Sequence, residues 1–142
     1  MLLAATADAV KVADAIDVEL AEWQNPNLLH TTGHTMTALA LALALGGDDA
    51  GDVDLLGPLV ATGLVDQVPS HSTVHRRHKE LADHDDEAAG AGTTAVLAGM
   101  KTARTAAWTA CGARNPAAAA STDAPLVLDL DATEIDRKST RL

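Results

Sequence analysis

Asp129 and Asp131 form the clearest chemical pattern in this 142-residue chain. They lie in the run Leu126-Val-Leu-Asp-Leu-Asp, whose leucine and valine content after Pro125 predicts a β-strand. Residues two apart on a strand point to the same face, so the two carboxylates would lie side by side. Such carboxylates repel each other unless a divalent cation such as Mg²⁺ is bound between them, as in metal-assisted phosphoryl transfer. The alternative is a strand end whose two acids are solvated.

A second pattern, PSHSTVHRRHKEL at residues 69–81, combines hydroxyl groups with a cluster of bases. It predicts a helix that begins near Pro69, where several side chains could cap it, and runs to about Ala82. A helix that reads DNA places polar side chains of its N-terminal turns at base edges and Lys or Arg at phosphates. The residues expected to do so are Ser72, Thr73, Arg76, Arg77 and Lys79. The alternative is a solvated helix face.

Three histidines of the same segment, His71, His75 and His78, would share one helix face at spacings i, i+4 and i+7. Such a face could provide part of a zinc site, but no cysteine or further well-spaced ligand joins them. The single cysteine, Cys111, also excludes an internal disulfide framework and a multi-cysteine zinc site. A surface face is therefore the preferred interpretation.

The composition limits both the partners and the packing of the chain. It has 10 Lys and Arg against 20 Asp and Glu, a formal charge of −10, which argues against a general nucleic-acid-coating protein. Any DNA affinity would depend on the local basic patch, and the acids between Glu80 and Glu87 predict weak, salt-dependent binding. Phe and Tyr are absent, so Leu, Val and Ala must fill the core, which suits thin, closely approaching helices. Trp23 and Trp108 are expected to anchor that core, and Cys111 to fill a small apolar space.

The elements that must position these residues are expected to be mainly α-helical. Apolar residues at three- and four-residue spacing predict one helix from about Ala7, capped by Thr6, to the turn at Pro26. Residues 35–45 are apolar on all sides, which predicts a helix in the middle of the bundle. The other expected elements are a short helix capped by Asp48 or Asp49, a turn at 59–65, an acidic break at 83–87, a long helix over 87–111 that Gly90 and Gly92 could break, and an exposed linker over 112–124.

The N-terminal residues lack the pattern of a secretory signal peptide, because Asp8, Lys11 and Asp14 interrupt the apolar stretch. The longest apolar run, residues 36–47, is shorter than the roughly 18 residues that a membrane-spanning helix needs. The expected location is therefore cytoplasmic, with no membrane partner.

The order and spacing of five segments carry a family resemblance. They are a helix ending near Trp23, His30 before a glycine, the Ala-Leu run with GGD at 38–48, PSHSTVHR at 69–76, and PLVLDLDAT at 125–133. Together they resemble the N-terminal part of bacterial insertion-sequence transposases of the DDE superfamily, of the insertion-sequence-1380 type. The resemblance covers about residues 18–135. It implies a helical DNA-binding region over 1–111 with a helix-turn-helix-like helix, followed after the linker by the first strand (125–135) of a truncated RNase-H-like catalytic domain.

The resemblance also implies a chemistry. Asp131, or less favourably Asp129, would be the first of three carboxylates that bind Mg²⁺ and cut DNA in the full-length enzyme. The partner would be the DNA of the element's terminal repeats. The chain could also form a homo-oligomer. The other two carboxylates have no counterpart here, so this fragment is expected to be inactive.

Two other interpretations stay open. The string LVLDLDATEI also resembles the first motif of haloacid-dehalogenase-like phosphatases, which would make Asp129 the nucleophile and Asp131 an acid/base. The chain could instead be a non-enzymatic helical binding or dimerisation module. Residues 136–142 (DRKSTRL) match the translation of a common sequencing-adapter read and are expected to be a non-native tail.

Overall fold

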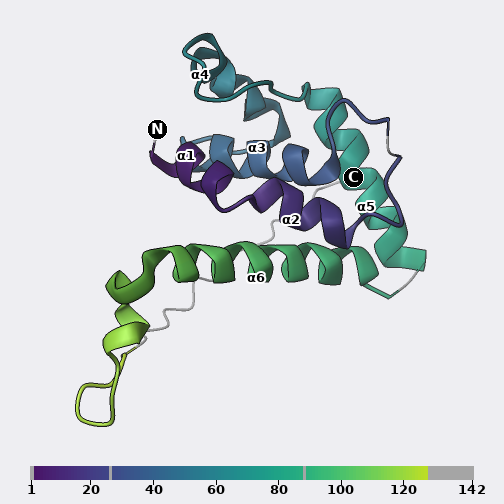
Figure 1. Cartoon of the computed structure of the whole chain (residues 1–142). Helices are drawn as coiled ribbons and strands as arrows, with labels where there is room; N and C mark the ends of the chain where they lie inside the picture. Colours follow the sequence, from purple (N-terminus) through teal and green to yellow (C-terminus); the bar gives the residue numbers. More distant parts are fainter. Residues whose placement is uncertain (1, 26, 88, 128–142) are drawn as a thin grey trace. The chain divides into compact units, whose positions relative to one another are not determined.

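The computed structural model describes residues 2–25, 27–87 and 89–127, and this part of the chain is mainly helical, without a strand. Contacts divide the chain into two units, residues 1–110 and 111–142. The helices of the first unit are α1 (Leu2–Ala9), α2 (Val12–Glu19), α3 (Thr32–Ala44), the 3₁₀ helix η1 (Ala50–Leu56), α4 (Gly57–Ala61), α5 (His71–Glu87) and α6 (Ala91–Cys111), which ends at the boundary (Figure 1).

The first predicted helix is in fact two helices, because the backbone turns at Lys11. Lys11 adopts a left-handed conformation with φ 55° and ψ 48°, which residues other than glycine rarely occupy. Its ammonium group lies 3.0 Å from the Asp8 carboxylate, which holds the turn locally. Thr6 does not cap a helix start as predicted; its hydroxyl donates to the carbonyl of Leu2 at 2.8 Å inside α1.

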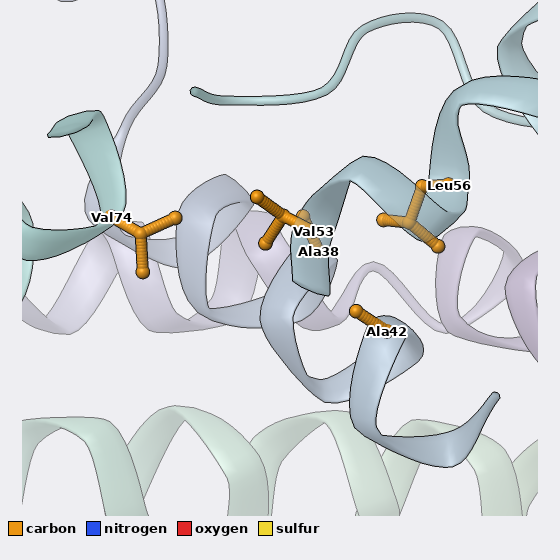
Figure 2. Close-up of a cluster of buried hydrophobic side chains, with 5 residues drawn as sticks. All are labelled: Ala38, Ala42, Val53, Leu56 and Val74. Carbon is orange, nitrogen blue, oxygen red and sulfur yellow. The ribbon is translucent and has the colours of Figure 1, made fainter. Parts of the chain in front are cut away.

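Helix α3 lies at the centre, as predicted, and contacts α1, α2, η1 and α5. Thr31 caps its first turn by accepting the N–H of His34 at 3.1 Å. The cluster on one side of α3 consists of small and medium apolar side chains from three elements (Figure 2): Ala38, Ala42, Val53, Leu56 and Val74. Asp49 caps η1 with a capping box that includes Asp52, so the prediction of a capped short helix is confirmed.

A second buried cluster joins α2 to α6. Ile16 and Leu20 pack with Ala95 and Val96, and the partly buried Trp23 covers them. The prediction that Trp23 anchors the core is therefore confirmed. The same prediction is wrong for Trp108, which is 48 % exposed on α6. The prediction that Cys111 fills a small apolar space is also wrong, because Cys111 is exposed.

Glycines allow helices to approach closely in this core. A Cβ atom on Gly99 of α6 would lie 2.6 Å from the Cα of Ile16 and 2.8 Å from the carbonyl oxygen of Ala15. A Cβ on Gly33 of α3 would overlap the carbonyl oxygen of Ala13 on the same helix α2. The expectation of thin, closely packed helices is met at both contacts of α2.

The predicted acidic break at residues 83–87 is wrong, because α5 continues through it to Glu87. The chain turns instead at Ala89 and Gly90, which both have positive φ. The acids have another role: the Asp85 carboxylate accepts the N–H of Thr93 at 2.7 Å, together with the Thr93 hydroxyl. A carboxylate at the start of a helix satisfies free N–H groups and complements the helix dipole. Asp85 thus caps α6 from the preceding helix.

In the second unit, the predicted linker contains two short 3₁₀ helices, η2 (Gly112–Arg114) and η3 (Pro116–Ala119). Asn115 caps η3 by accepting the N–H of Ala117 at 2.9 Å. Residues 120–127 are exposed and form no strand. The rest of the predicted strand, with Asp129 and Asp131, and the 136–142 tail lie outside the described residues.

Candidate nucleic-acid interface

The start of α5 is fixed by Ser70 and Val74. The Ser70 hydroxyl accepts the N–H of Thr73 at 3.3 Å and lies 3.0 Å from the hydroxyls of Ser72 and Thr73. Val74 is fully buried against α3 and η1, and Pro69 before the cap is also fully buried. These contacts determine which side of the first two turns faces outward.

The outward side carries most of the residues predicted to contact DNA. Ser72, Arg76 and Lys79 are exposed and Thr73 is half-buried. Because residues at i, i+4 and i+7 lie on one side of a helix, Ser72, Arg76 and Lys79 form one surface. We call these three residues with Thr73 the α5 surface. It presents hydroxyl groups at the N-terminal end of the helix and bases behind them.

The positive charge of the α5 surface is small. The Lys79 ammonium contacts both carboxylate oxygens of Asp83, at 2.6 and 2.8 Å, and this hydrogen-bonded pair raises the pKa of Lys79. Arg76 makes no ion pair within the described residues and is exposed. The net attraction for a phosphate therefore comes mainly from Arg76.

Arg77 lies on the opposite side of α5, contrary to its predicted phosphate contact. Its side chain is 6 % exposed, one guanidinium nitrogen lies 2.6 Å from Glu80 Oε2, and its buried Nε has no hydrogen-bond partner among the described residues. Val74, Arg77 and Leu81 are spaced i, i+3 and i+7, so Arg77 shares the inner side with two packed apolar residues. Arg77 is therefore a structural residue in this conformation and does not belong to the candidate interface.

The connection before α5 also differs from a helix-turn-helix. Such motifs join their helices by a turn of about three or four residues, whereas residues 62–70 separate α4 from α5. His34 of α3 holds this connection through a 3.1 Å hydrogen bond to the carbonyl oxygen of Gln67. The position of α5 therefore depends on α3 and η1 rather than on a short turn.

The histidines of α5 do not converge on one point. The rings of His71 and His75 meet edge to face with centroids 4.5 Å apart, and burial, with His75 nearby, lowers the pKa of His78. The described residues contain no group of three or more His, Cys, Asp or Glu side chains arranged to hold a metal ion.

Sequence reasoning missed a pair of histidines at the start of α3. The Nδ1 atoms of His30 and His34 lie 3.2 Å apart, and the rings are tilted by 35°. Burial and the neighbouring His34 lower the pKa of His30, which favours its neutral form. The i, i+4 spacing in His-Thr-Thr-Gly-His is the signal that could have identified the pair.

Comparison of the chain with protein-family models, curated proteins and solved structures found no match. Within the described part of the chain, none of the helices has the length and apolar character required to cross a bilayer.

Proposed function

We propose that the α5 surface contacts DNA and that the chain is the helical targeting region of a DDE transposase of the insertion-sequence type. The observation that carries the proposal is the orientation of α5. Val74, Arg77 and Leu81 hold the helix against the bundle, which leaves Ser72 and Arg76 exposed and Thr73 half-exposed at its N-terminal turns. Hydroxyl and guanidinium groups are suited to base edges and phosphates. The order of sequence motifs supports the choice of family.

Electrostatics set the expected strength of this contact. Lys79 is paired with Asp83, and the chain carries a net charge of −10. Each phosphate contact contributes about one unit to the slope of log affinity against log salt. Binding should therefore be weak and detectable mainly at low ionic strength.

The test is fluorescence anisotropy with a labelled pool of random-sequence duplexes at low salt, using the full chain. The expected result is salt-sensitive binding that Arg76→Ala weakens. Arg104→Ala is the matched control, because Arg104 is also exposed but lies on α6. Absence of binding, or equal losses for the two arginine variants, would contradict the proposal.

For the full-length enzyme we propose Asp131, with Asp129 as second choice, as the first Mg²⁺-binding carboxylate. Carboxylate oxygens are suitable hard ligands for that ion, which would place the attacking and leaving oxygens during DNA strand cleavage and transfer. The informative observation is the gene sequence beyond Ile135. A further Asp and Glu on an RNase-H-like sheet would support this assignment, whereas a Lys with a second acidic motif would favour the phosphatase.

A non-enzymatic dimerisation module is the second candidate, and α6 favours it. Leu97, Met100 and Trp108 are exposed on α6, whose buried residues include Val96 and Gly99. An apolar stripe of this kind marks a protein contact when it is continuous. Light scattering of the wild type and of Leu97→Glu tests it: a dimer that becomes monomeric supports this function, and a monomeric wild type contradicts it.

A further inference from the structure

We propose that His30 and His34 form a two-imidazole site for a borderline divalent transition-metal ion, represented by Zn²⁺. The site lies at the start of α3, apart from the α5 surface, and does not depend on the DNA-binding proposal. Imidazole nitrogen is a preferred ligand of zinc, copper and nickel ions.

The distance between the two Nδ1 atoms is the first argument. Zinc–nitrogen bonds are about 2.0–2.1 Å long, and two such ligands at a tetrahedral angle lie about 3.3 Å apart. The observed separation of the Nδ1 atoms of His30 and His34 is 3.2 Å. The separation of the two Nδ1 atoms therefore equals that between two nitrogen ligands of one tetrahedral ion.

The hydrogen bond on the far side of His34 is the second argument. Its Nε2 lies 3.1 Å from the carbonyl oxygen of Gln67. A carbonyl oxygen only accepts, so Nε2 carries the proton and the neutral ring has its lone pair on Nδ1, towards His30. Histidines that bind metals usually donate their other N–H to a carbonyl or carboxylate, as His34 does here.

The tautomer of His30 must then differ between the metal-free and the metal-bound site. Without metal, its Nδ1–H donates to the Nδ1 lone pair of His34, which accounts for the 3.2 Å contact. With metal, the His30 Nδ1 lone pair binds the ion and its proton moves, through solvent, to Nε2. His30 changes tautomer, His34 keeps its own, and no net proton is released.

The remaining coordination positions would be filled by water, because no third His, Cys, Asp or Glu completes a metal-binding group within the described residues. Within the described residues the site thus offers two protein ligands and is otherwise open to water. A bound ion would join the segment before α3 to its first turn and, through Gln67, to the connection that leads to α5.

The experiment is a Zn²⁺ titration of the ¹⁵N-labelled full chain, followed by long-range ¹H–¹⁵N spectra that report each imidazole tautomer. The titration is repeated with His30→Gln and His34→Gln. The matched control is the double variant His71→Gln and His75→Gln, which removes an equally spaced pair on α5. Circular dichroism verifies that every variant remains helical.

The expected result is that Zn²⁺ converts His30 from the Nδ1–H to the Nε2–H form while His34 stays Nε2–H. Loss of an outer-shell partner alone typically lowers metal affinity about 10- to 100-fold, so loss of either ligand should lower it by about tenfold or more. The α5 control should bind as the wild type does. The proposal is overturned if Zn²⁺ leaves the tautomer of His30 unchanged, or if the α5 variant abolishes the response.

Discussion

The carboxylate of Asp17 on α2 accepts the backbone N–H of Gly33 in the first turn of α3, at 2.7 Å. Gln24 donates to the same carboxylate at 2.9 Å, and its own side-chain oxygen accepts the N–H of Thr32 at 3.3 Å. The start of α3 is thus capped partly by side chains that precede it in the chain. Asp85 does the same for α6, so two helices of the bundle are capped from a neighbouring helix.

Substitution of Asp17 should lower stability because it leaves N–H groups of α3 without a partner. Asp17→Ala is expected to reduce the free energy of unfolding by about 1–2 kcal/mol, the range for a lost helix cap. The measurement is urea denaturation followed by circular dichroism. Glu22→Ala, at an exposed position after the same helix, should change it by less than about 0.5 kcal/mol. Equal effects of the two substitutions would contradict the capping role.

Alanine at Gly99 should be destabilising, although alanine favours helices over glycine by about 1 kcal/mol. Its Cβ would lie 2.6 Å from the backbone of Ile16, so α2 and α6 would have to separate. A loss of about 1–3 kcal/mol is expected from such overpacking. Thr94→Ala is the control, because Thr94 is exposed on the same helix α6, where alanine only raises helix propensity. The control variant should be as stable as the wild type or more stable. Chemical denaturation measures the change in the free energy of unfolding for both variants.

Arg76 and Arg77 are neighbours in sequence but should behave differently on replacement. Arg77→Ala removes a buried side chain and its contact with Glu80, so we expect unfolding to become easier by about 1–3 kcal/mol. Arg76→Ala should leave stability within about 0.5 kcal/mol, because its side chain is exposed. Thermal and urea denaturation of both variants provide the comparison. An unchanged stability in Arg77→Ala would contradict its structural role.

Acid should weaken the fold through two aspartates with lowered pKa values. Hydrogen bonds from Thr93 lower the pKa of Asp85, and the N–H groups of Asp48 and Asp49 lower that of Asp52. A lowered folded-state pKa means that the unfolded chain binds protons first as the pH falls. The stabilisation is therefore complete above the ordinary value of 3.8 and is lost as the pH falls below it towards the folded-state pKa.

The measurement for this pH dependence is the urea midpoint between about pH 6 and pH 2. Asp85→Asn should flatten the acid limb of the curve, whereas Asp86→Asn, an exposed neighbour whose carboxylate is not a helix cap, should not. Identical acid limbs in wild type and Asp85→Asn would show that the Asp85–Thr93 contact contributes nothing to stability.

The helical class and the central position of α3 could be predicted from the sequence, because apolar periodicity and all-round apolar character are local properties. The positions of the breaks between helices could not be predicted from the sequence. The break at Lys11 depends on a left-handed residue that is not glycine, and the continuation of α5 through its acids depends on a cap supplied to α6. Both contacts are short-range, Lys11 with Asp8 and Asp85 with Thr93, but neither changes the apolar periodicity from which helix boundaries are predicted.

The candidate site was predictable only in part, for a related reason. The sequence identifies which residues of the 69–81 segment could contact DNA, but the helix register decides which of them face outward. That register follows from Val74, which is fully buried, and it turns Arg77 inward while Arg76 stays exposed. The pairing of His30 with His34 could have been suspected from spacing, but its link to Gln67 connects residues 33 positions apart.

Helix α2 is only eight residues long, well below the roughly 12–15 residues that an isolated helix needs to persist in water. It nevertheless supplies the capping carboxylate for α3 and the backbone against which Gly33 and Gly99 rest. Helix α2 is therefore stabilised by its contacts with α3 and α6, and it helps to position both of these helices. The N-terminal part of the bundle should close in one cooperative step, and a peptide that stops at residue 25 should remain a coil.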